Sequence, residues 1–347
     1  MTASSEDIIR IALANRAYRT GTIRLVDPDL ATCSHLIATR HGLFATDRRT
    51  VRRIAHGLFY GLTVRDDLIF AFEAGDRPHN PSCHGRIVRF RRDGDRIVAA
   101  DIVATGLDNG CHQIDIIDDR LCVVDTYNQR ILRYALEGGG PEILYPIGAA
   151  GAGFERQGSA RDGRESENGP GDWAHGYAHM NSIVAQGDHI LLLLHNGADK
   201  TDRPSEIVRL DRAWRPIDRI PLDGLGCHSL AVLDGGAGLD GGAILTCGSF
   251  SGELISTDGL KIPVCDMMTR GLSVDGRDVG EEGGGIAVGG SAFADRASRD
   301  GEQGRVFFLD GRYRPLGSVA VPAPVMDIRR IDGRDRSLSS YLARQPS

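Results

Sequence analysis

Two histidines stand in the same local setting at two distant points of the chain. Each is the last residue of a Gly-Cys-His triplet, at 110–112 and at 226–228, which makes His112 and His228 the first candidates for a shared site. Neutral imidazole binds zinc, iron, manganese or copper, whereas a shell of nitrogen ligands does not suit calcium or magnesium. The pair therefore predicts a divalent transition metal, namely zinc, iron or manganese, with copper as a further candidate.

Two more histidines lie shortly before residues that hold equivalent places in the sequence repeat described below. His179 precedes Asn181 by two residues, and His56 precedes Tyr60 by four. An even offset keeps side chains on the same side of an extended strand, so each histidine is expected to point the same way as its partner. We expect both to join the first pair as metal ligands. A shell of only three ligands would leave a position for water or substrate.

Arg270 and Tyr60 also hold equivalent places in the repeat, and both could act on a bound substrate. The guanidinium of Arg270 would bind a carboxylate or phosphate, or stabilise a developing oxyanion. Tyr60 could act as a general acid or base. The alternatives are a surface ion pair for Arg270 and plain packing for Tyr60. Asn181, which occupies a further equivalent place, is expected to bind substrate.

The cysteines of the two triplets, Cys111 and Cys227, are adjacent to the histidines. Their thiolates could bind a soft metal or act as nucleophiles. Strand alternation, however, turns them away from the histidine side, where cysteine serves as a small apolar filler. We expect packing between neighbouring sheets. Asp125 could orient His112 or hold a turn, and the turn role is favoured.

These places belong to a segment that recurs about every 50 residues and is expected to form strands. It consists of a variable residue, a small or polar residue, and two apolar residues separated by one position. It occurs six times, starting at Tyr60, His112, Asn181, His228, Arg270 and, more loosely, Pro324.

Each segment is followed by a turn, a strongly apolar run and two further short runs, such as LCVVD (121–125) and RILRYA (130–135). Four strands per repeat of this length are typical of a propeller blade. We predict an all-β, six-bladed propeller of four-stranded antiparallel blades over residues 21–340. Five of its blades are expected near 60–103, 112–147, 181–222, 228–264 and 270–321.

The sixth blade is expected to contain both ends of the propeller. Residues 324–331 have the form of a first strand with no second strand after them, and 35–56 supply three more strands. Pairing them closes the ring and removes two exposed edges. Residues 1–20 are expected to form a short N-terminal helix. A seventh blade would require residues 22–26 to do more than pack.

The third repeat, HQIDIIDDRLCVVDTYNQRILRY (112–134), carries a recognisable pattern in Asp125, Asn128, Arg130 and Ile131. It resembles an NHL-type blade. The chain is thus similar to a broad group of six-bladed propellers that includes NHL proteins, the regucalcin/gluconolactonase group, streptogramin lyases and the peptidylglycine amidating lyase. The resemblance implies a fold and not a function. Several of these relatives hold a metal in the central channel, which implies one here without naming its ligands.

The long connections are expected to gather on the face of the ring where the first strands begin. They cover 73–85, 196–205, 291–304 and the glycine-rich stretch 148–178, which is long enough to be a lid. Loops over a rigid scaffold often carry function, although long polar loops are also tolerated as insertions. His84 and His175 lie on these connections and are expected to contact substrate.

Composition excludes some partners. The net charge is −6, and arginines alternate with aspartates, as in RRDGDR (91–96), which argues against binding of nucleic acid. Seven cysteines, an odd number without a CxxC pair, favour a reducing compartment. The sequence shows no signal peptide and no apolar stretch of about 18 residues. We expect a cytoplasmic protein that does not bind membranes. The oligomeric state stays open.

The favoured function is a metal-dependent enzyme that acts on a small polar, anionic molecule in the central channel by lyase or hydrolase chemistry. One alternative is an oxygenase with iron held by four histidines. Another is a non-catalytic propeller that binds a peptide, glycan or protein on its long-loop face. The enzyme requires the nitrogens of His112 and His228 to lie within about 4 Å of each other. Histidine side chains that point away from each other, together with an apolar channel, would contradict the enzyme hypothesis.

Overall fold

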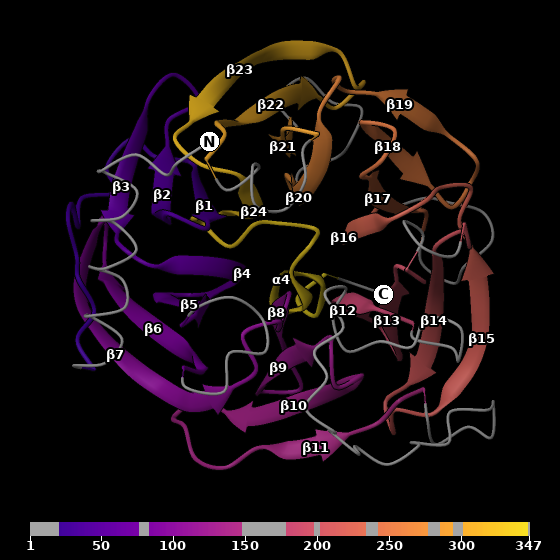
Figure 1. Cartoon of the computed structure of the whole chain (residues 1–347), viewed down its shortest axis with the longest axis horizontal. Helices are drawn as coiled ribbons and strands as arrows, with labels where there is room; N and C mark the ends of the chain where they lie inside the picture. The colour runs from indigo at the N-terminus through magenta and orange to yellow at the C-terminus, as the bar shows by residue number, and fades with distance from the viewer. Residues whose placement is uncertain are drawn as a thin grey trace.

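Six four-stranded antiparallel sheets stand around a central axis, each with its first strand innermost (Figure 1). The computed structural model describes residues 21–75, 83–147, 178–197, 202–233, 242–276, 285–293 and 301–345. The predicted fold class, a six-bladed β-propeller, is confirmed.

Blade 1 combines strands from both ends of the chain, whereas blades 2 and 3 are each formed by consecutive strands. Blade 1 consists of β24 (Val325–Arg330), β1 (His35–Thr39), β2 (Gly42–Thr46) and β3 (Val51–Ala55). Blade 2 consists of β4 (Leu58–Arg65), β5 (Leu68–Ala74), β6 (Gly85–Asp93) and β7 (Arg96–Leu107). Blade 3 consists of β8 (Ile114–Ile117), β9 (Arg120–Asp125), β10 (Arg130–Ala135) and β11 (Glu142–Leu144).

The other three blades follow in sequence order. Blade 4 consists of β12 (Met180–Gln186), β13 (His189–Leu194), β14 (Glu206–Asp211) and β15 (Pro216–Pro221). Blade 5 consists of β16 (Cys227–Val232), β17 (Ile244–Gly248), β18 (Glu253–Ser256) and β19 (Lys261–Pro263). Blade 6 consists of β20 (Met268–Val274), β21 (Gly285–Ser291), β22 (Gly304–Asp310) and β23 (Pro315–Val321).

The strongly apolar second strand of each blade is covered on both faces by its neighbours. In β13, for example, the residues from Ile190 to Leu194 are all buried. Six apolar clusters result among the described residues, one at each contact between adjacent blades. Burial of apolar surface on both faces of every sheet therefore stabilises the ring of blades. The ring in turn holds the innermost strands in place around the channel.

The ring is closed as the sequence predicts. β24 pairs with β1 in antiparallel register, so that Ile328 lies opposite Ile37. Residues 22–26 do not add a blade to the described part of the chain. Leu25 makes a single bridge with Ala55, and Asp29 makes another with Arg96. The predicted N-terminal helix at 1–20 and nearly all of the 148–178 stretch lie outside the described residues.

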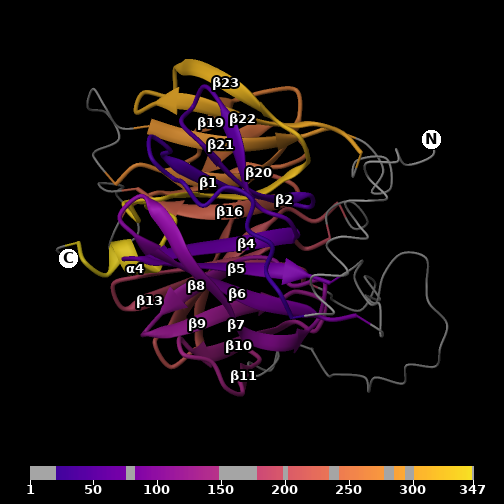
Figure 2. The same cartoon turned by 90° about the vertical axis from the view of Figure 1, so that its left-hand side faces the viewer.

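The C-terminal segment closes one end of the channel, which the sequence did not predict. Its short helix α4 (Ser339–Leu342) lies in the middle of the ring in Figure 1 and at one face of it in Figure 2. The backbone N–H of Ser339 donates to Asp115 of β8 at 2.9 Å, and the hydroxyl of Ser340 donates to the carbonyl of Val64 at the end of β4. The channel therefore opens at the opposite face.

The described residues include no helix with the length and apolar character that a membrane span requires.

Candidate metal centre at the mouth of the channel

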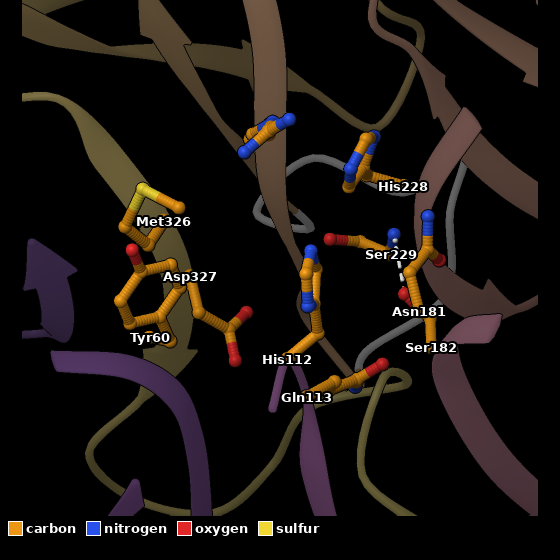
Figure 3. Close-up of a pocket in the computed structure, with 10 residues that line it drawn as sticks. Tyr60, His112, Gln113, Asn181, Ser182, His228, Ser229, Met326 and Asp327 are labelled. Atoms are coloured by element: carbon orange, nitrogen blue, oxygen red, sulfur yellow. Dashed lines mark hydrogen bonds between the residues drawn. The ribbon is translucent and has the colours of Figure 1, made fainter. Parts of the chain in front are cut away.

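A cavity of about 330 Å³ lies at the open end of the channel, and side chains of all six innermost strands or their first residues line it (Figure 3). An outer tier holds one side chain from each blade, namely Tyr60, His112, Asn181, His228, Arg270 and Met326. A deeper tier is formed by the residues that follow four of these, namely Gln113, Ser182, Ser229 and Asp327. The predicted convergence of the repeat's first positions is thus observed in five blades.

The first blade differs from the prediction by two residues. Met326 lines the cavity in the place that we had expected Pro324 to take. The repeat pattern failed here because Arg330 stands where other blades carry an apolar residue. Arg330 is buried through ion pairs with Asp275 and Asp332, at 2.8 Å and 2.7 Å. A buried charge with two partners can replace an apolar side chain in a strand, and no apolar pattern reveals it.

The deeper tier ties neighbouring blades together. The amide oxygen of Gln113 accepts from the N–H of Ile183 at 3.0 Å. The hydroxyl oxygen of Ser182 accepts from the N–H of Ser229 at 2.8 Å, and Asp327 Oδ2 accepts from the N–H of Leu62 at 2.9 Å. These bonds fix the spacing between blades directly beneath the outer tier.

His112 and His228 occupy matching environments, as their identical triplets predict. In His112, Nδ1 lies 2.8 Å from the carbonyl oxygen of Gly110 and 2.9 Å from the hydroxyl of Thr126. In His228, Nδ1 lies 2.8 Å from the carbonyl oxygen of Gly226 and 2.8 Å from the hydroxyl of Ser249. Thr126 and Ser249 each directly follow the second strand of their blade.

These contacts determine which nitrogen of each ring is protonated. A carbonyl oxygen only accepts, so Nδ1 must carry the hydrogen in both rings. In blade 5, Ser249 confirms this, because its own hydroxyl hydrogen goes to the carbonyl of Thr269 at 2.6 Å. The lone pair of each ring is therefore on Nε2. Metal-binding histidines commonly donate their other ring N–H in this way. Nε2 of His228 is buried and has no hydrogen-bond partner among the residues that the structure describes.

The glycines of the triplets are required by aromatic rings that pack over them. A Cβ at Gly110 would collide with the ring of Tyr127, and a Cβ at Gly226 would collide with the ring of Phe250. Tyr127 and Phe250 directly follow Thr126 and Ser249. Blades 3 and 5 therefore share one local design, in which a hydroxyl and a carbonyl hold the histidine while a ring covers the triplet.

The cysteines of the triplets are packing residues. Cys111 and Cys227 are fully buried and belong to the clusters between blades 2 and 3 and between blades 4 and 5. Burial raises the pKa of the Cys227 thiol to about 11 and that of Cys111 well above its usual value. Both thiols remain protonated near neutral pH, which argues against the alternative of a thiolate ligand or nucleophile.

His179 joins the pair. One ligand atom from each of His112, His179 and His228 can be chosen so that all three lie within 4.8 Å of one another. The separation is somewhat wider than the 4 Å expected from the sequence, but the histidines converge and do not splay. His179 adopts a left-handed backbone conformation, with φ of 49°, just before β12. Three imidazoles of this kind fit a divalent transition metal.

His56 is not part of this group among the described residues. It lies between β3 and β4, where its N–H donates to the carbonyl of Arg24. The predicted even offset from Tyr60 requires both residues to lie on one strand. β3 ends at Ala55 and β4 begins at Leu58, so His56 lies in the connection between two strands and not on the strand that carries Tyr60.

A fourth histidine near the centre is one that the sequence analysis missed. His195 directly follows β13, and its ring centroid lies 4.6 Å from that of His179 and 5.2 Å from that of His228. A signal for it existed, because His195 holds the same place after the second strand as Thr126 and Ser249. The signal lies in the residue after the apolar run and not in the run itself.

Arg270 places a positive charge beside these histidines. Burial, with a further contribution from the Arg270 guanidinium, lowers the pKa of His195 to about 3 and that of His228 well below its usual value. Both rings are therefore neutral at physiological pH, which is the form that binds a metal.

Asn181 and Tyr60 line the cavity as predicted. The amide nitrogen of Asn181 donates to the carbonyl of Cys227 at 2.8 Å, which leaves Oδ1 buried and without a hydrogen-bond partner. The ring of Tyr60 is buried against Phe72, with its centroid 6.3 Å from that of His112. The two side chains stand on opposite sides of His112 in Figure 3.

Asp327 is a second residue that the sequence analysis missed. Figure 3 shows its carboxylate beside the cavity between Tyr60 and His112. Burial raises the pKa of Asp327 to about 6, although hydrogen bonds and the adjacent Arg329 act against this rise. Arg329 donates to Asp327 Oδ1 at 2.6 Å. A strongly buried carboxylate next to a cavity is a candidate for proton transfer.

Three other predictions have different outcomes. His84 is exposed just before β6 and is not among the residues that line the cavity. His175 lies outside the described residues. Asp125 holds a turn, as favoured, because it accepts from Asn128 and Arg130 at 2.8 Å and 2.6 Å.

Comparison with known proteins supports the fold. No protein family matches the chain, and no curated protein matches it in sequence. A chain in a nidogen–laminin complex is 10% identical, with a TM-score of 0.53 over 88% of this chain and 99% of that chain. A protein of unknown function from Bacteroides caccae is 10% identical, with a TM-score of 0.49 over 86% and 98%.

Regucalcin from Agrobacterium tumefaciens strain C58, described as a calcium-binding protein, is 9% identical, with a TM-score of 0.46 over 86% of this chain and 79% of that chain. At such identities a likeness concerns the fold alone. The six four-stranded sheets of this chain confirm the resemblance to six-bladed propellers at the level of the fold.

Proposed function

We propose that this protein is a metal-dependent enzyme whose active site is the cavity at the mouth of the channel. Its substrate is a small polar anion, and its chemistry is that of a lyase or hydrolase. The observation that carries the proposal is the convergence of His112, His179 and His228 within 4.8 Å. Two of these rings have their Nδ1 atoms held by a carbonyl and a hydroxyl, which presents Nε2 to an ion.

The charges around the cavity favour an anionic substrate. Three neutral imidazoles do not offset the double positive charge of a divalent ion, and Arg270 adds another positive charge at the rim. A carboxylate or phosphate that binds both Arg270 and the centre offsets this charge. The cavity is enclosed by only ten described residues, which favours a small molecule as the substrate.

The residues of the cavity have distinct roles in this proposal. A bound divalent transition metal polarises a carbonyl or hydroxyl of the substrate. Asn181 Oδ1, buried and without a partner, accepts a hydrogen bond from a substrate hydroxyl or amine. Arg270 holds the anionic group. Tyr60, on the side of the cavity near Asp327, moves a proton to or from the substrate.

A second candidate function is an oxygenase with an iron centre held by four histidines. The observation that favours it is the position of His195 next to His179 and His228. A non-catalytic propeller that binds a macromolecule is less well supported. All but one of the described residues that line the channel mouth carry a polar side-chain group, and a purely structural channel does not require histidines that converge.

The test is elemental analysis of protein purified without chelator and without a nickel affinity tag. We expect about one zinc, iron, manganese or copper ion per chain. The double variant His112→Ala, His228→Ala is expected to lose it, whereas His189→Ala, at the start of β13, keeps it. Wild-type protein without metal that also fails to bind added zinc, manganese or iron would contradict the proposal.

A further inference from the structure

His195 is positioned by the same pairing that positions His179. The N–H of His195 donates to the carbonyl of His179 at 3.0 Å, so the two residues face each other at the open end of β12 and β13. Their ring centroids are 4.6 Å apart. Blade 4 therefore presents two imidazoles in the place where blades 3 and 5 each combine one imidazole with a hydroxyl.

Four imidazole rings form a closed circuit at the mouth. Neighbouring centroids are 5.2 Å apart for His112 and His179, and 4.6 Å for His179 and His195. They are 5.2 Å apart for His195 and His228, and 6.3 Å for His228 and His112. Each ring thus contacts two others, and the rings come from three consecutive blades.

These spacings agree with four rings around one ion. With a metal–nitrogen distance of about 2.1 Å, the centroids of two imidazoles at a tetrahedral angle lie about 5 Å apart, and the distance approaches about 6 Å at wide angles. All four centroid distances fall close to this range. Unrelated histidines have no reason to form a circuit of this size, because four neighbouring imidazoles compete for hydrogen-bond partners and desolvate one another.

His195 is also a buried polar group that needs a partner. The residue is 5% exposed, and its Nδ1 is buried without a hydrogen-bond partner among the described residues. An orphaned buried nitrogen of this kind destabilises the fold unless a ligand binds to it. The ring of Phe250 packs edge-on against His195, with the two ring centroids 5.8 Å apart.

We propose that His195 is the fourth ligand of the centre, so that the ion is held by His112, His179, His195 and His228. The inference rests on the proposed function, since it concerns the same ion. The nitrogens of His195 are not part of the 4.8 Å group, so its ring must turn about its side-chain torsions to reach the ion. The resulting shell is neutral, and the ion keeps its full double charge for binding an anion in a fifth position.

The test uses cobalt(II) as the probe, with two measurements on full-length protein. X-ray absorption on the wild type should show four nitrogen ligands at imidazole distances, and this measurement does not depend on how a variant folds. His195→Gln should show three and should bind cobalt about 100-fold more weakly, because loss of even a residue that only orients a ligand costs about 10–100-fold. His189→Gln is the matched control and should behave as the wild type.

The outcomes separate this inference from the function on which it rests. Three nitrogen ligands in the wild type, or unchanged affinity and ligand number in His195→Gln, would overturn the role of His195 and leave the three-histidine centre intact. Absence of cobalt binding by the wild type, or equal binding by His112→Ala, His228→Ala, would overturn the proposed function itself.

Discussion

The two ends of the central channel both contain buried polar side chains, but they differ in how those side chains are satisfied. At the closed end, Asp335 accepts five hydrogen bonds, from the hydroxyl of Ser273, both the backbone and hydroxyl of Ser337, and the N–H groups of Val274 and Arg330. At the open end, Nε2 of His228, Oδ1 of Asn181 and Nε2 of Gln113 are buried and have no hydrogen-bond partners in the described part of the chain.

The difference shows which end is built for stability and which for a ligand. A satisfied buried carboxylate ties the C-terminal segment to the innermost strands and contributes to folding. An unsatisfied buried group destabilises the fold by about 1–3 kcal/mol, so several of them around one cavity indicate a site that a bound species completes. The comparison predicts opposite consequences of mutation at the two ends.

The largest effect is expected at the closed end. Asp335→Ala removes five hydrogen bonds in a fully buried setting and should lower the free energy of unfolding by about 3–5 kcal/mol. Urea denaturation followed by fluorescence would measure this loss. The fraction that remains folded should still bind metal, because no contact of Asp335 reaches the histidines.

Asp223→Ala is the matched control. Asp223 is exposed and forms an ion pair with Lys261 at 2.8 Å, so its removal should change stability by less than about 1 kcal/mol. Two results would contradict the view that the closed end serves stability alone. One is an Asp335→Ala protein as stable as the wild type, and the other is a folded Asp335→Ala protein that has lost its metal.

A smaller and different effect is expected at the open end. Ser249→Ala removes the hydroxyl that orients His228 and also donates to Thr269, and should weaken metal binding about 10–100-fold. Thr126→Val should act in the same direction on His112. Both should leave most of the stability in place. Competition of the protein with a chromogenic chelator would measure the affinity.

Ser251→Ala provides the control in the same turn, because its hydroxyl contacts only the carbonyl of Gly248 at 3.3 Å. It should bind metal as tightly as the wild type. If Ser249→Ala and Ser251→Ala bound metal with equal affinity, the hydroxyl that follows the second strand would have no role in orienting the metal ligand. The contacts that blades 3 and 5 share would then serve only the stability of the fold.

Much of the fold could be predicted because strand patterns survive in the repeat. Apolar runs such as 190–194 must be buried on both faces, and their regular recurrence about every 50 residues indicates blades. The two Gly-Cys-His triplets then placed His112 and His228 at one end of the channel. Their local contacts are nearly identical in the structure, which explains why the repeated triplet was informative.

The rest depends on contacts that no local pattern encodes. His195 lies after a strand and stands beside His179 because β13 pairs with β12. His56 fails because it lies in the connection between β3 and β4 and not on the strand that carries Tyr60. Arg330, which is buried by ion pairs, interrupts the apolar pattern that would have shown the register of β24. The closure of the channel by α4 depends on a hydrogen bond from Ser339 to Asp115, which are far apart in the sequence.

The central claim is that one transition-metal ion occupies the mouth of the channel. Its most direct test is anomalous diffraction from crystals soaked in zinc, recorded on both sides of the zinc absorption edge. We predict a single strong peak about 2.1 Å from Nε2 of both His112 and His228, with His179 as a further ligand. A cavity without a peak, or zinc found only on surface carboxylates, would contradict the account.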